Sequence, residues 1–230
     1  GKGMNYLKTS CGLLVLWVAG VVWGADALTP EQKEVMQFME KMYSYDPMTF
    51  EEGYFLKKTG APLLRNQVPA AFSAIKFLPE KMCLFLKLYF DDGVFQKREG
   101  KYGSHDCLLP SRYPYLGAED ISSVTRVEDI PVPYIKPPVV SGNRAKVEVF
   151  PAGNKTISNP PSFDLGRNLY FLTKFENGWR VTNVMIHTKW PDLDDGTHNC
   201  YFSLAKPAND EERSESTRLN SSHRCLSRMP

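Results

Sequence analysis

The chain has 230 residues, of which 42% are hydrophobic and 23% are charged, and its formal net charge is +2. This composition can fill a packed core, so a wholly disordered chain is excluded. No apolar run reaches the roughly 18–20 residues that span a bilayer, which excludes a polytopic membrane protein. Five cysteines are too few for a disulfide-dense scaffold. The length fits one domain with extensions or two small domains.

The N-terminal residues 1–27 have the pattern of a secretory signal peptide. Lys8 supplies a positive charge, residues 11–23 form a short apolar run, and small residues around Ala25 stand where a signal peptidase prefers them. We therefore predict a periplasmic or secreted protein that starts near Ala25 or Leu28 and keeps no stable membrane span after cleavage. The alternative is an uncleaved membrane anchor, for which the run is short.

The C-terminal residues 206–230 are predicted to lie outside the domain. From Arg213 onward the chain is rich in Ser and Arg without apolar periodicity, so it is either a disordered tail or an artefactual end similar to translated cloning sequence. Residues 1–27 carry +1 and residues 213–230 carry +3 of the total +2, which leaves −2 for the rest. This balance predicts no nucleic-acid partner, and it gives no support for an anionic membrane.

The domain is predicted to begin with a helix. Thr29 and Gln32 can form a capping box around Pro30, and apolar residues then recur every three or four positions as far as Tyr43. The pair Asp46-Pro47 should end the helix, because a residue before proline avoids helical angles.

Softer signals follow in the middle of the chain. Residues 50–58 are predicted to be helical, and residues 60–69 to form a loop. Pro79 should then start a second helix over residues 79–90, with a stop at Asp91-Asp92-Gly93. This helix is apolar on most faces, so we expect it to pack on a sheet.

The second half of the domain reads as antiparallel strands. Residues 126–135 look extended, and alternating apolar residues in 145–150 indicate a half-buried strand. Two further strands, 168–175 and 179–187, flank Asn177-Gly178, which favours a type I′ hairpin turn with two positive φ angles. Helices first and a meander afterwards predict an α+β domain, with helices on one face of an antiparallel sheet.

Two segments carry a family resemblance. They are residues 113–121 (YPYLGAEDI) and the strand start Gly178-Trp179-Arg180-Val181. Over roughly residues 30–190 the chain resembles the bacterial domain-of-unknown-function 3828 family of small exported proteins, which is similar to the nuclear-transport-factor-2-like superfamily. Tyr113 stands where that family usually has Asp, and Glu119 where it has Gln. The resemblance implies a single domain over residues 28–205, built as a cone of helices on a curved sheet, and no established activity.

Three cysteines remain in the predicted mature domain, and an oxidising compartment favours their pairing. Cys107 and Cys200 lie in polar, loop-like contexts, whereas Cys83 lies in the apolar helix, where a buried free thiol is ordinary. We therefore predict a disulfide between Cys107 and Cys200.

No metal, cofactor or catalytic residue is predicted. The acidic residues 192–195 lack the spacing of a calcium loop and read as a solvated turn. His198 and Cys200 alone do not make a zinc pattern. His105, next to Asp106 and Cys107, does not establish a catalytic triad, because triads form in space and not by adjacency. The common nucleotide-binding and hydrolase motifs are also missing from the sequence.

The candidate binding site is the concave face of the sheet. Alternation places Phe171 and Phe175 on one face of their strand, and it places Trp179 and Met185 on one face of the next, which His187 continues. The alternative interpretation is core packing under the helices. With one aromatic residue from the family segment, the predicted binding residues are Tyr115, Phe171, Phe175, Trp179, Met185 and His187.

These patterns predict an exported, non-enzymatic domain that binds an unknown small ligand or protein partner, with an immunity protein as one subclass. The alternative is a small pocket enzyme of the isomerase or hydratase type in the same fold. Such chemistry needs a carboxylate or histidine inside the cone, for which Asp120, Glu148 and His187 are the candidates.

Overall fold

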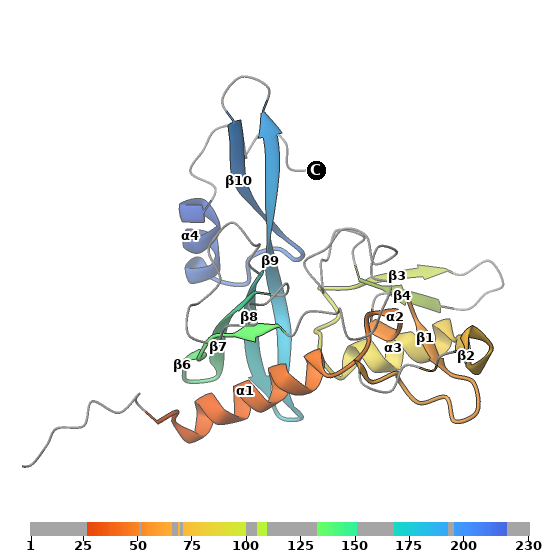
Figure 1. Ribbon diagram of the computed structural model, residues 1–230. Helices are drawn as coiled ribbons and strands as arrows, with labels where there is room; N and C mark the ends of the chain where they lie inside the picture. Colours follow the sequence, from red (N-terminus) through yellow and green to blue (C-terminus); the bar gives the residue numbers. More distant parts are fainter. Residues whose placement is uncertain are drawn as a thin grey trace, which may run out of the picture.

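The protein is a mixed α+β structure with antiparallel sheets, which confirms the predicted class (Figure 1). A computed structural model describes residues 27–50, 52–65, 69, 71–99, 105–109, 133–150, 168–192 and 196–219. Residues 1–26 of the predicted signal peptide lie outside the described residues, and so does the first of the two segments that carry the family resemblance, residues 113–121. Within the described residues, no helix is long and apolar enough to cross a membrane.

The largest sheet has six strands and forms the centre of the molecule. Its order is β10-β9-β8-β7-β5, β6 also pairs with β7, and every pairing is antiparallel. The strands predicted over 145–150, 168–175 and 179–187 are confirmed, and the last of them runs on to pair with a further strand. The strands are β5 (Tyr134–Ile135), β6 (Val139–Ser141), β7 (Arg144–Phe150), β8 (Asn168–Phe175), β9 (Gly178–Asp192) and β10 (Gly196–Ser203).

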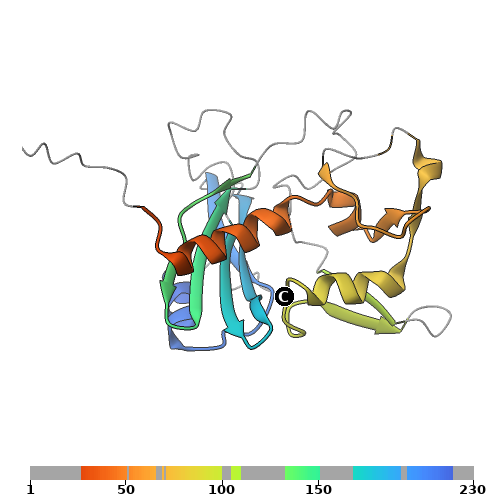
Figure 2. The same ribbon diagram turned by 90° about the horizontal axis from the view of Figure 1, so that it is seen from below.

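Helix α1 (Pro30–Tyr43) begins as predicted and crosses one face of this sheet (Figure 2). The Thr29 hydroxyl accepts the Gln32 N–H at 3.2 Å, and the Gln32 side chain accepts the Thr29 N–H at 2.9 Å. The amide of Gln32 also donates to the Pro138 carbonyl at 2.9 Å. The buried side of the helix packs on apolar residues of β7, β8 and β9 in the main core, which includes Met39, Met42, Val147, Val149, Tyr170, Leu172, Val181 and Val184. We call this side of the sheet the α1 face.

The predicted helix over residues 50–58 is wrong. Helix α2 is a single turn, Pro47–Phe50, and Gly53 then adopts a positive φ of 75°, a conformation that interrupts a right-handed helix and favours glycine. The chain continues into strand β1 (Tyr54–Leu56), which pairs with β2 (Ile75–Phe77) after the short 3₁₀ turn η2 (Phe72–Ala74).

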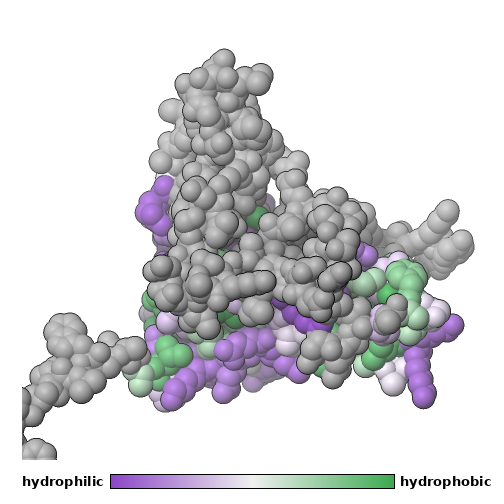
Figure 3. All heavy atoms as spheres, in the orientation of Figure 1, coloured by the Kyte–Doolittle hydropathy of each residue, from purple (hydrophilic) through white to green (hydrophobic). Residues whose placement is uncertain are grey.

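Helix α3 (Pro79–Lys87) confirms the predicted second helix, but its packing differs from expectation. It packs on strand β4 (His105–Leu108) of a separate two-stranded ribbon with β3 (Gln96–Glu99). Leu84 is 71% exposed, so the helix is not buried on most faces. Hydrophobic residues reach the surface at this end of the molecule (Figure 3).

A disulfide between Cys83 and Cys107 joins α3 to β4, with a Cα–Cα distance of 4.8 Å. The predicted pair Cys107–Cys200 is therefore wrong, because Cys107 already has its partner. The polar sequence around Cys107 did not indicate that its strand, β4, packs against the apolar helix α3. Cys200 lies in β10, opposite Thr188 of β9.

The structure also differs from the predicted disordered tail. Residues 210–219 form helix α4 (Asp210–Leu219), which lies across the sheet from α1 (Figures 1 and 2). The Asn209 side chain caps it by accepting the Glu212 N–H at 3.0 Å. Polar capping and buried polar contacts stabilise this helix. Its sequence therefore lacks the apolar periodicity from which a helix could have been predicted.

The hairpin between β8 and β9 is confirmed, but its turn type is not. Phe175 pairs with Gly178, which leaves Glu176 and Asn177 as the central residues. Gly178 has the expected positive φ, at 103°, whereas no described non-glycine residue has one, so Asn177 cannot complete a type I′ turn. A single glycine after the turn supplies the twist instead, as in three-residue hairpin loops.

Candidate functional site

A β-bulge decides which side chains reach each face of the sheet. In the register of β8 and β9, Phe171 is opposite Asn183 and the next residue, Leu172, is opposite Val181. Thr182 is therefore an extra residue in β9, and its hydroxyl donates to the Phe171 carbonyl at 3.2 Å. An unpaired residue shifts the alternation of every residue that follows it in the strand.

The predicted common face of Trp179 and Met185 is therefore wrong. Trp179 and Val181 belong to the main core on the α1 face. Beyond the bulge, Val184 returns to that core, so Met185 points to the opposite side of the sheet, which we call the second face. A period-two pattern in the sequence cannot reveal this change.

Two predicted binding residues come together on the second face. Phe171 and Met185 form a small buried cluster with Leu169 and Tyr201. Phe175 does not join it, because it lies beside the hairpin turn and is 43% exposed.

Trp179 serves the α1 face instead. The ammonium group of Lys174 lies 5.7 Å from the centre of the Trp179 ring and 2.6 Å from the Glu34 carboxylate on α1. The hydrogen bond from Lys174 lowers the pKa of Glu34. These contacts fasten the helix to the hairpin, so Trp179 contributes to packing.

The remaining two predicted binding residues are not tested. Tyr115 lies outside the described residues. His187 lies in β9 opposite Tyr201, and its side chain is not among those that the structure describes.

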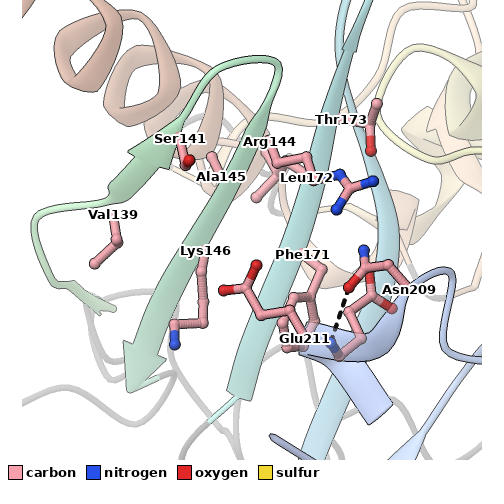
Figure 4. Close-up of a pocket in the computed structure, with 11 residues that line it drawn as sticks. Val139, Ser141, Arg144, Ala145, Lys146, Phe171, Leu172, Thr173, Asn209 and Glu211 are labelled. Carbon is pink, nitrogen blue, oxygen red and sulfur yellow. Dashed lines mark hydrogen bonds between the residues drawn. The ribbon is translucent and has the colours of Figure 1, made fainter. Parts of the chain in front are cut away.

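A pocket opens on the second face between the β6–β7 hairpin, β8 and the start of α4 (Figure 4). Its empty volume is ≈ 380 Å³, which includes space open to solvent. Phe171 supplies an aromatic surface, and Arg144 and Lys146 of β7 supply positive charge. Glu211 extends from α4 toward β7 on the other side of the pocket. The pocket thus combines an apolar surface with charges of both signs.

A buried polar pair holds α4 at this pocket. Asn183 is fully buried and Glu212 is 3% exposed. The Glu212 carboxylate accepts from the Asn183 amide at 3.3 Å and from the Ala208 N–H at 3.1 Å. The Asn183 oxygen accepts from the backbone N–H groups of Val184 at 2.8 Å and Ala205 at 3.0 Å. Because a buried carboxylate needs donors, these bonds fix where α4 starts.

Sequence reasoning missed both members of this pair. Asn183 points to the second face because of the bulge, and Glu212 lies in the segment that was predicted to be disordered. The only local signal was the spacing of Asn209 and Glu212, which is that of a helix cap and its third residue.

Of the three candidate acids and bases, only Glu148 has a side chain that the structure describes. Glu148 does not line the pocket and forms an ion pair with Lys136 at 3.1 Å. Asp120 lies outside the described residues. Among the side chains that the structure describes, no group of three His, Cys, Asp or Glu residues is placed to hold a metal ion.

Comparisons with protein-family models, curated proteins and solved structures give no significant match. The candidate site therefore rests on the geometry of the chain itself.

Proposed function

We propose that the chain is an exported, non-enzymatic binding or protein-interaction domain, and that the pocket on the second face is its binding site. The observation that carries this proposal is the buried pair Asn183–Glu212, which holds α4 beside Phe171, Arg144 and Lys146. Burying a carboxylate costs free energy that an apolar contact would not cost. A face built in this way positions polar groups at a defined site.

The chemistry of the pocket favours a ligand with an apolar group beside charged groups. Arg144 and Lys146 suit a carboxylate or another anion, Glu211 suits a cation, and Phe171 supplies an apolar contact. A segment of a protein partner carries such groups together, and so does a small amphipathic molecule. Glu148, the one candidate acid or base whose side chain is described, forms an ion pair with Lys136. This pairing favours binding over isomerase or hydratase chemistry.

Export and family membership are part of the same proposal. The N-terminal pattern of residues 1–27 supports secretion, and the Cys83–Cys107 disulfide is compatible with an oxidising compartment. Helix α1 across one face of an antiparallel sheet supports a relation to the cone-shaped nuclear-transport-factor-2-like domains. Helix α4, on the opposite face, would be an addition to that arrangement.

Affinity capture from a bacterial periplasmic extract tests the proposed site. The wild-type chain should retain a partner, and the charge reversal Arg144→Glu/Lys146→Glu should lower that retention about tenfold or more, as the loss of two charge-assisted contacts predicts. Lys33→Glu is the matched control, because Lys33 is exposed on α1 and does not line the pocket.

Equal retention by the charge-reversed and control proteins would contradict the proposed site. Native mass spectrometry of the secreted protein tests whether the ligand is a small molecule. A mass that is bound to the wild-type and Lys33→Glu proteins, but not to the charge-reversed protein, would identify the pocket as a small-molecule site.

A further inference from the structure

A cluster of exposed and partly exposed aromatic rings lies over β1, η2 and β2. These elements form the end of the molecule away from the pocket (Figure 1), and hydrophobic residues reach the surface there (Figure 3). It consists of Tyr54, Phe72 and Phe77, and we call it the aromatic patch. The ring of Tyr54 lies 5.4 Å from that of Phe72 and 6.0 Å from that of Phe77, measured between centroids. Phe72 is 65% exposed and Phe77 is 46% exposed. Large aromatic side chains gathered in water mark a surface that meets a partner.

The backbone holds these rings outward. Tyr54 and Phe77 are cross-strand neighbours in the small sheet, whereas Phe55, the residue after Tyr54, turns inward and is buried in the main core. Gly53 has a positive φ, and a Cβ atom there would lie 3.2 Å from the Phe77 ring, so glycine lets this ring lie against the backbone. The aromatic patch is therefore presented by an anchored sheet.

Exposed lysines flank the aromatic patch. Lys57 donates its backbone N–H to the Ala74 carbonyl at 2.9 Å, which places Lys57 and Lys58 beside the turn that carries Phe72. Lys76 on β2 is exposed as well, but alternation along the strand turns it to the face opposite that of Phe77. Among the residues that the structure describes, the exposed acidic residues near this sheet are Glu52 and Glu80, which lie where the chain enters β1 and leaves β2. The end of the sheet that carries Phe72 is therefore locally basic.

We propose that the aromatic patch docks the protein on an anionic phospholipid surface. Aromatic rings are favoured at the headgroup level of a membrane, and lysines beside them are attracted to anionic lipids. The slightly negative net charge of the domain does not oppose this docking, because charges more than about 8–10 Å away are largely screened at physiological salt. Docking here leaves the second-face pocket free, so the inference does not depend on the proposed function.

Vesicle co-sedimentation tests the proposal. The probes are vesicles of equimolar phosphatidylglycerol and phosphatidylcholine, compared with vesicles of phosphatidylcholine alone, and every variant carries the same N-terminus. Phe72→Ser should lower the partition coefficient on anionic vesicles about tenfold, as the loss of one buried phenylalanine predicts. Lys57→Gln and Lys58→Gln should each lower it about fivefold. Phe175→Ser, at a phenylalanine on the β8–β9 hairpin that is 43% exposed, should bind like the wild type.

Equal binding of Phe72→Ser and Phe175→Ser, or equal binding of the wild type to both kinds of vesicle, would overturn the proposal. A dimer in light scattering that Phe72→Ser abolishes, without any vesicle binding, would assign the aromatic patch to a second copy of the chain. Retention on a soluble acidic peptide without vesicle binding would assign it to an acidic protein. Thermal melts of Phe72→Ser control for folding. Partner capture through the pocket should be the same in Phe72→Ser as in the wild type, which separates the two proposals.

Discussion

The two faces of the main sheet carry different kinds of side chain. On the α1 face, aliphatic and aromatic side chains of β7, β8 and β9 pack with one side of α1 in a single large core. On the second face, the apolar cluster is limited to Leu169, Phe171, Met185 and Tyr201, and it is bordered by the buried pair Asn183–Glu212 and by charged residues of the pocket. The same strands therefore supply stability on one side and polar groups in defined positions on the other.

The bulge at Thr182 connects these two roles. Without the extra residue, the alternation that places Val181 in the main core would also place Asn183 there and would turn Val184 away from it. The bulge keeps apolar residues on the α1 face from Trp179 to Ile186 and sends a buried asparagine to the second face. One inserted residue thus separates the apolar core on the α1 face from the buried polar pair on the second face.

The largest expected effect is on the α1 face. Leu172→Ala should lower the free energy of unfolding by about 2–5 kcal/mol, because it leaves a cavity in the main core. Thr173, the next residue, lines the pocket and is only partly buried, so Thr173→Ala should cost less than about 1 kcal/mol. Urea denaturation measures both. Similar losses for the two variants would mean that the faces do not differ in this way.

The second-largest expected loss of stability comes from removing the disulfide between α3 and β4. Replacing both cysteines, as Cys83→Ser/Cys107→Ser, should cost about 3 kcal/mol, because the bond closes a loop with a sequence separation of 24. Chemical denaturation measures the cost, and peptide mapping without reduction should find Cys83 linked to Cys107. A linked peptide pair of Cys107 and Cys200 would instead support the pairing that the sequence suggested.

A smaller loss is expected where α4 meets the second face. Glu212→Ala should cost about 1–3 kcal/mol, because the Asn183 amide and the Ala208 N–H lose their buried acceptor. Glu211→Ala, at the exposed neighbouring position, should change stability by less than about 0.5 kcal/mol. Thermal melts of the two variants measure the difference. If both melt like the wild type, α4 does not dock on the sheet.

The smallest effect concerns the carboxyl group of Asp46, which is buried beside the main core. Burial raises the pKa of Asp46 above its ordinary value of 3.8, although the Met48 N–H donates to its carboxylate at 2.9 Å and the charge of Arg65 opposes the shift. The folded state then binds the proton more tightly than the unfolded state. The contribution of Asp46 to stability therefore falls as the pH rises from 3.8 through the raised pKa, and stays low above it.

Asp46→Asn removes this titration and should keep an oxygen that can accept from Met48. Urea denaturation at several pH values should show the wild type gaining stability relative to Asp46→Asn as the pH is lowered from neutral to below 3.8. A difference that does not change with pH would mean that Asp46 titrates alike in both states.

Local patterns in the sequence were sufficient to predict much of the α1 face. The capping box at Thr29, the alternation through Val147 and the glycine of the β8–β9 hairpin each depend on a few neighbouring residues, and the structure confirms them. The turn type was not predictable in the same way, because Asn177 tolerates positive φ without requiring it.

The second face depends on events that are not local. The bulge at Thr182 is fixed by the register against β8, and Glu212 is buried only because Asn183 reaches the same place from another strand. The Cys83–Cys107 pair likewise needs β4 to pack on α3. Apolar periodicity pointed to Phe171, which lines the pocket, but not to the charged groups of the pocket.

Photo-crosslinking in the periplasm tests most directly whether the second face is the binding face. A photoreactive amino acid at Thr173, which lines the pocket, should form a discrete adduct with a partner, and Arg144→Glu/Lys146→Glu in the same chain should abolish that adduct. The same amino acid at Lys33, which is exposed on α1, should form none. An adduct from Lys33 but not from Thr173, or no adduct from either position, would contradict the assignment of binding to the second face.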